Sequence, residues 1–231
     1  MSAPSILAIR AGNKSMTRRV IKPQPALRQS LWEWNSGARE ASWAGSIARP
    51  ESMLQHAPYA VGDLVRVKEA WRLVDFEHID GDWNASVLYR ADNARGLRVH
   101  NLSPDVDLTW RSPLFMPEWA SRYVLRITEV RVERVQDISV EDCAAEGILS
   151  LASIRRRHYY ATDNAEFALD QFASVWEALH SKPKPVLVKG VLDHYVSYPW
   201  EDTRETRDHR GKPWQVMGNP WGWAYSFEVV K

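Results

Sequence analysis

The C-terminal segment carries the strongest structural constraint in the sequence. Large residues stand at positions 221, 223, 225, 227 and 229, and smaller or polar residues stand between them. Because successive side chains of a β-strand point to opposite faces, this period of two predicts a strand with one buried face. The chain is therefore expected to build a sheet that includes this segment.

Three other segments also predict strands. They are residues 64–71, 86–90 and 123–132, which alternate or are rich in β-branched and aromatic side chains. In the first of them the period of two places a carboxylate, Glu69, on an otherwise apolar face. Such a carboxylate either pairs with a cation or lies at the rim of a cleft. The face consists of Val65, Val67, Glu69 and Trp71.

Three segments predict helices. Residues 5–11 form a short helix that ends at Gly12, a residue common just past a helix end. A second helix begins after Ser139, a good N-cap residue, and ends at Gly147. A third covers residues 165–180, with apolar positions at helical spacing. These positions are Leu169, Phe172, Val175, Trp176 and Leu179.

Long irregular segments separate the predicted elements. Residues 26–58 have no sustained period and are predicted as an insertion. Residues 181–219 are rich in proline and charge and are predicted as a surface excursion. Residues 92–121 contain three prolines and are predicted as loop. The mixture of strands and helices places the chain in the α+β class.

The charges are unevenly distributed. A net charge of +1 over 231 residues argues against a protein that coats nucleic acid nonspecifically. Residues 1–32, however, hold six basic side chains and no acidic one. This basic patch fits a phosphate-bearing or nucleoside ligand, and an ordinary solvated face explains it equally well. A basic and aromatic run at 155–160 is typical of nucleic-acid surfaces, with a solvated insertion as the alternative.

Composition limits the compartment and the cofactors. The single cysteine, Cys143, excludes an internal disulfide and fits a reducing compartment. No apolar stretch reaches the roughly 18 residues needed to span a membrane. The seven histidines lack metal-ligand spacing, and there is no phosphate loop or dinucleotide fingerprint. We therefore expect a cytoplasmic protein with no membrane span, metal or organic cofactor.

A short run near the N-terminus combines residues suited to hydrolysis. Lys14 precedes Thr17 by three residues, so both could lie on one turn. Threonine needs a neighbouring base to act as a nucleophile. Lysine is such a base when burial or nearby cations, here Arg18 and Arg19, lower its pKa. Glu69 would pair with Lys14. The alternative is that Thr17 is a cap after the helix and Glu69 marks a strand end.

Five ordered blocks resemble phage-type ASCH-domain proteins. The first reads Gly12-x-Lys14-x-x-Thr17-Arg18-Arg19 and continues to a Pro-Gln-Pro sequence. The last reads Asn-Pro-Trp-Gly-Trp. The blocks span nearly the whole chain in the family's order, which makes the resemblance specific. They cover residues 12–25, 61–71, 116–122, 136–147 and 219–223.

The resemblance implies a fold related to the PUA domain. This is a small, mostly antiparallel β-barrel with flanking helices, here expected as a single domain over residues 1–231. Insertions near 26–58, 73–110 and 181–219 are long compared with the small amidohydrolases of the family. They are expected to be long loops that narrow, cover or enlarge the cleft.

The resemblance also implies a chemistry. Some ASCH-domain proteins are amidohydrolases that remove acyl groups from N4-acylated cytidines. Lys14, Thr17 and Glu69 match the positions of their proposed triad. Thr17 would attack the acyl carbon, Lys14 would take its proton, and Glu69 would hold Lys14 and pass the proton to the leaving amine. The expected substrate-binding residues are Arg18, Arg19 and Trp71, the last by stacking on the base.

Two other functions stay open. Other ASCH and PUA-like proteins are expected to bind RNA. The chain is then a non-catalytic RNA- or modified-nucleotide-binding module, with Lys14, Arg18 and Arg19 on phosphates. A third possibility is a phage accessory or morphogenesis protein whose insertions bind protein partners. The expected partner is thus a modified cytidine nucleoside or RNA.

Overall fold

The computed structural model describes most of the chain. The basic and aromatic run at 155–160 lies outside the described residues, as does much of the predicted insertion at 26–58. The described residues are 2–22, 24, 26–28, 31–33, 50–79, 82–102, 109–148, 161–201, 204–207, 211 and 213–231.

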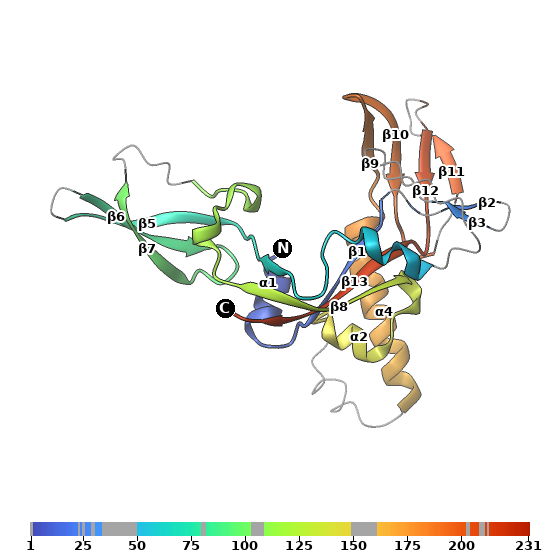
Figure 1. Cartoon of the computed structure of the whole chain (residues 1–231), viewed down its shortest axis with the longest axis horizontal. Coiled ribbons are helices and arrows are strands. Elements are labelled where there is room, and N and C mark those ends of the chain that lie inside the picture. Colours follow the sequence, from blue (N-terminus) through green and yellow to red (C-terminus); the bar gives the residue numbers. More distant parts are fainter. Residues whose placement is uncertain are drawn as a thin grey trace. The chain divides into compact units, whose positions relative to one another are not determined.

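The chain divides into two compact units (Figure 1). The first unit comprises Met1–Ser15, Val61–Thr128 and Phe227–Lys231, and the second comprises Met16–Ala60 and Glu129–Ser226. Both units are therefore assembled from separated segments. Strands β8 (Val124–Arg134) and β13 (Trp221–Val229) run from one unit into the other. The single domain expected from the sequence stays a prediction.

The described part of the first unit combines helix α1 with antiparallel strands. Strand β4 (Leu64–Arg66) pairs antiparallel with the beginning of β8. The strands β5, β6 and β7 form a three-stranded antiparallel sheet. The elements that complete this unit are α1 (Ala3–Arg10), β5 (Trp71–Ile79), β6 (Asp82–Tyr89), β7 (Arg95–Leu102), η2 (Pro113–Phe115) and η3 (Glu118–Ala120).

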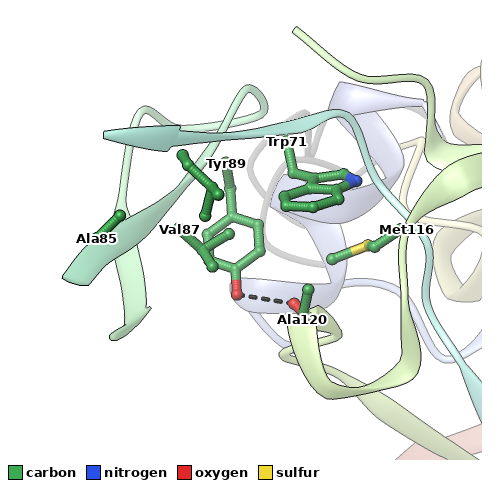
Figure 2. Packing of buried hydrophobic residues seen from close by; sticks show 7 residues of the cluster. Trp71, Ala85, Val87, Tyr89, Met116 and Ala120 are labelled. Carbon is green, nitrogen blue, oxygen red and sulfur yellow. Dashed lines mark hydrogen bonds between the residues drawn. The ribbon is translucent and has the colours of Figure 1, made fainter. Parts of the chain in front are cut away.

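The core of the first unit lies between this sheet and the segment after it. In Figure 2 the rings of Trp71 and Tyr89 pack beside Met116, and the Tyr89 hydroxyl donates to the Ala120 carbonyl at 2.8 Å. Gly96 on β7 belongs to the same packing, because a Cβ there would lie 2.3 Å from the Tyr89 ring. The cluster comprises Trp71, Leu73, Ala85, Val87, Tyr89, Met116 and Ala120.

The described part of the second unit contains a four-stranded sheet and the helices α2 and α4. Strand β10 is antiparallel to β9 and parallel to β12, and β11 is antiparallel to β12. Strand β1 pairs antiparallel with β13. The elements are β1 (Met16–Val20), β2 (Ala26–Arg28), β3 (Leu31–Glu33), η1 (Pro50–His56), η4 (Val135–Asp137), α2 (Val140–Ala145), α4 (Ala161–His180), β9 (Lys184–Val188), β10 (Val191–Ser197), β11 (Arg204–Arg207) and β12 (Pro213–Val216).

The described fold is therefore α+β, rich in strands and mostly antiparallel, as expected from the sequence. Strand β13 confirms the strand predicted at the end of the sequence. The prediction of a single buried face is wrong over residues 222–225, where side chains of both faces are buried. The Ser139 side chain caps α2 by accepting the Asp142 N–H at 3.1 Å. Gly147 follows α2 with a positive φ of 78°, as a helix stop often does.

The predicted strand at 64–71 is wrong in its extent. Regular pairing stops at Arg66, and a new strand begins at Trp71. The physical reason is that β8, the partner of β4, begins only at Val124. The predicted alternation of burial survives the break, because residues 67, 69 and 71 are buried and residues 66 and 68 are exposed.

Two predicted loop regions contain strands instead. Strand β7 lies within the predicted loop at 92–121, and β9 to β12 lie within the predicted surface excursion at 181–219. Strand β11 reads Arg-Glu-Thr-Arg and has no apolar residue, and β9 and β12 each contain a proline, which argues against a strand in sequence-based prediction. Strand preference depends on cross-strand neighbours rather than on the residues alone. The predicted insertion at 73–110 likewise consists largely of β5 to β7.

The buried face of α4 is narrower than predicted. Val175 and Leu179 are 43% and 58% exposed, although their spacing predicts core positions. The buried side chains lie at every fourth position: Ala168, Phe172 and Trp176. They pack with Val135, Ile138 and Cys143 around α2, so one stripe of α4 meets the core.

This stripe predicts unequal costs for two substitutions on α4. Phe172→Ala empties a core site and should lower the free energy of unfolding by about 3–5 kcal/mol. Val175→Ala, one turn away on the exposed side, should change it by less than about 0.5 kcal/mol. Urea unfolding of both variants measures the difference, and equal losses would contradict the assigned face.

Candidate functional site

Lys14 is held in place by the end of helix α1. Gly12 adopts a φ of +71°, and its N–H donates to the Ile9 carbonyl at 3.0 Å. The N–H of Asn13 donates to the Ala8 carbonyl at 2.9 Å, which completes a Schellman motif. The Lys14 N–H reaches the same Ala8 carbonyl at 3.2 Å. The predicted helix stop therefore also fixes the backbone of the candidate base.

Glu69 lies in the irregular segment between β4 and β5. The Val67 N–H donates to the Tyr123 carbonyl at 2.9 Å, and the Ser121 hydroxyl donates to the Val67 carbonyl at 2.9 Å. The Glu69 N–H points to the Met116 sulfur at 3.3 Å. The loop before β8 thus takes the place of a strand partner and fixes Glu69 with its side chain inward.

Arg122 holds the Glu69 carboxylate with two parallel hydrogen bonds. Its Nε donates to Oε1 at 2.7 Å, and its Nη2 donates to Oε2 at 2.9 Å. The same guanidinium donates to both oxygens of Asp92, at 2.9 and 3.1 Å, and Asp92 also accepts from Arg10 at 2.6 Å. The guanidinium carbon lies 4.2 Å from the centroid of the Tyr89 ring. This chain of ion pairs lies wholly in the first unit.

The protonation of this network follows from its contacts. Burial alone would lower the pKa of Arg122, but the hydrogen bonds to Glu69 and Asp92 outweigh burial and raise it. Burial would raise the pKa of Asp92, but the hydrogen bonds from Arg122 and the Ala94 N–H hold it below its usual value. Both groups therefore remain charged at neutral pH. The sequence pattern does not predict roles for Arg122 and Asp92, although Arg122 belongs to one of the matching blocks.

Thr17 and Arg19 share one face of strand β1 in the second unit. Thr17 is half-buried and pairs with Tyr225, and Arg19 is exposed and pairs with Trp223. Met16 and Arg18 point to the opposite, buried face. The predicted nucleophile is thus on a strand rather than on a turn, three positions along the chain from Lys14.

Arg18, predicted to bind substrate, is surrounded by carboxylates. Its side chain contacts Glu133, Asp142 and Glu146 at distances of 2.5 to 3.4 Å between nitrogen and oxygen. Arg131 donates to the same Asp142 at 2.7 Å. The structure thus places Arg18 in a buried ion network of the second unit. Its role toward a substrate stays a prediction.

Trp71, predicted to stack on a base, lies in the core of the first unit. Its ring meets Trp119 edge to face, with 5.9 Å between centroids, and Arg111 lies 5.0 Å from its centroid. Trp119 is the exposed member of the pair. Stacking of Trp71 on a substrate likewise stays a prediction.

Three residues that the sequence predicts for the site, Lys14, Arg18 and Glu69, are buried. Among the described residues, these three are the charged residues buried as a whole, at 6%, 7% and 1% exposure respectively. Burying charge is costly unless each group is paired or used, so buried charges often mark ion networks or functional sites. Lys14 and Glu69 belong to the first unit, and Arg18 and Thr17 belong to the second.

Other candidate chemistry is limited. No group of histidine, cysteine or acidic side chains in the described ranges could hold a metal ion. Burial raises the pKa of Cys143 to about 11, so this thiol is a core residue rather than a nucleophile. No helix in the part of the chain that the structure describes is long and apolar enough to cross a membrane.

No family model, curated protein or solved structure matches the chain.

The Arg122 network predicts a large loss of stability from one arginine and a small loss from another. Arg122→Met leaves Glu69 buried without its main partner and should cost about 3–5 kcal/mol. Arg126→Met is the matched control, because Arg126 pairs with Glu228 at the exposed surface and should cost at most about 1 kcal/mol. Denaturant unfolding distinguishes the two, and a difference below about 1 kcal/mol would contradict the assignment.

Proposed function

We propose that this protein is an amidohydrolase that removes the acyl group from an N4-acylated cytidine or a related modified nucleoside. The proposal rests on the resemblance of five sequence blocks to ASCH-domain proteins. It is supported by one observation above others: two of its three triad residues, Lys14 and Glu69, are among the few charged side chains buried in the described structure.

In the proposed reaction the Thr17 oxygen attacks the acyl carbon while Lys14 accepts the hydroxyl proton. The C–N bond then breaks, and the exocyclic amine of cytosine leaves with a proton passed on by Glu69. Water hydrolyses the resulting threonine ester and releases the carboxylic acid. Backbone N–H groups and the protonated Lys14 stabilise the negative oxygen of the intermediate.

The Arg122 contact is compatible with this role for Glu69. A carboxylate has about four lone-pair positions, and the two bonds from Arg122 use one on each oxygen. One position on each oxygen remains for Lys14 and for the leaving amine.

Three residues of chain keep the Cα atoms of Lys14 and Thr17 within about 11 Å of each other. A PUA-like barrel and a cytoplasmic location belong to the same proposal.

Hydrolysis of N4-acetylcytidine tests the proposal directly. The purified protein should release cytidine, as followed by chromatography, and Thr17→Val should lower the rate at least about 1,000-fold because the nucleophile is lost. Lys14→Ala and Glu69→Gln should have effects of similar order. Thr128→Val is the control, since Thr128 is exposed on β8 and should retain full activity. An inert wild type, also with longer acyl groups, would refute the proposal.

The second candidate is a nucleotide- or RNA-binding module without catalysis. It is favoured by the exposure of Arg19, one of the three cations expected on phosphates. The other two, Lys14 and Arg18, are buried. RNA binding that weakens with salt, in a protein that releases no cytidine, would select this function.

A further inference from the structure

Three exposed cations gather at one end of helix α4 in the second unit. Arg19 lies on β1, Lys22 follows that strand, and Lys184 begins β9. All three side chains are exposed, and they come from segments far apart in the sequence. We refer to these three residues as the basic cluster.

Side-chain and backbone contacts bring the three segments together. The Lys22 Nζ lies 5.5 Å from the centroid of the Tyr198 ring. The Tyr198 N–H donates to the carbonyl of His180, the last residue of α4, at 2.9 Å. Lys184 pairs with Val196 on β10, two residues before Tyr198. The loop after β1, the end of α4 and the start of β9 therefore meet around Tyr198.

Buried aromatic side chains pack around Tyr198. The Trp176 indole N–H donates to the Tyr198 carbonyl at 2.9 Å, and the Trp176 ring stacks on His180 with 4.1 Å between centroids. Trp176 and Tyr198 are each 4% exposed. Lys22 thus lies beside a buried aromatic ring, and both Trp176 and Tyr198 are too buried to stack on a base.

The cations act on one another. Partial burial lowers the pKa of Lys22, and the positive charge of Lys184 lowers it further. Burial lowers the pKa of His180 to about 4, and Lys184, Lys22 and Arg19 contribute to this in the same direction. His180 is therefore neutral at pH 7, and the cluster carries a concentrated positive charge.

No carboxylate compensates this charge in the part of the chain that the structure describes. Within those ranges, no acidic side chain forms an ion pair with Arg19, Lys22 or Lys184. Glu177, the acid on the last turn of α4, accepts the backbone N–H of Trp200 at 2.9 Å. The C-terminal end of a helix supplies only about half a negative charge, well below three cations.

We propose that Arg19, Lys22 and Lys184 form a binding site for phosphate groups of a nucleotide or a polynucleotide. Ammonium and guanidinium groups form charge-assisted hydrogen bonds with phosphate oxygens. Contacts to phosphate carry no base information, so this site has little sequence preference. The site lies within the second unit and does not depend on the proposed hydrolysis, because N4-acetylcytidine has no phosphate.

Binding to three probes tests the site and identifies the phosphate source. The probes are cytidine, cytidine monophosphate and a single-stranded RNA of about 12 nucleotides, each titrated at low and high salt. Lys22→Met with Lys184→Met should weaken phosphate binding at least about 10-fold, and Lys22→Arg with Lys184→Arg should restore it. Arg66→Met with Arg126→Met changes the net charge equally on the first unit and should have no such effect.

Each outcome has a distinct meaning. Tight binding of the monophosphate identifies a nucleotide site, and binding of RNA alone identifies a polynucleotide site. Cytidine should not depend on the basic cluster. Binding of neither phosphate probe, or binding that the Lys22 and Lys184 substitutions leave unchanged, overturns the proposal. Loss of phosphate binding with normal hydrolysis of N4-acetylcytidine would show that the two functions are separate.

A second readout reports on the cluster itself. The ring of His180 should titrate in NMR spectra with a pKa of about 4 in the free protein. Bound phosphate neutralises the surrounding cations, so it should raise this pKa toward the ordinary histidine value. A pKa unchanged by saturating RNA and by saturating monophosphate would place the ligand elsewhere and contradict the proposal.

Discussion

The ion pairs of the Arg122 guanidinium are the interactions on which the first unit most depends. It fixes the buried carboxylate of Glu69 with two hydrogen bonds and links it to Asp92 and Arg10. It also lies on the Tyr89 ring, which belongs to the core of the unit. Removing this cation would leave buried negative charge, which costs more free energy than the ion pair itself contributes. The candidate catalytic carboxylate and the core therefore share one support.

The basic residues of the N-terminal segment differ in whether they have an acidic partner. Arg10 and Arg18 pair with acidic partners within their units. Arg19 and Lys22 instead stay exposed near Lys184, with no ion-pair partner among the described acids. A charge count cannot separate these two groups, because it treats paired and unpaired cations alike. This difference in pairing is the basis for proposing a phosphate site at Arg19, Lys22 and Lys184.

Local signals predicted the elements that depend on local physics. The stop at Gly12, the cap at Ser139 and the strand β13 follow from backbone conformation and pairing, and all three are present. The sequence did not predict where β4 ends, because that depends on where its partner β8 begins. It also placed Val175 in the core, since helical spacing does not say how wide a stripe the neighbours cover. Glu69 was marked by its apolar face, whereas its partner Arg122 lies 53 residues away and has no local signal.

The central claim is that Lys14, Thr17 and Glu69 act on one acyl group. A crystal structure of the Thr17→Val variant with bound N4-acetylcytidine tests it most directly, because the variant should bind the substrate without cleaving it. The account predicts the acyl carbon within about 3.5 Å of the valine side chain introduced at position 17, with the Lys14 ammonium beside the Glu69 carboxylate. A nucleoside bound away from these residues, or an acyl group directed away from position 17, would contradict it.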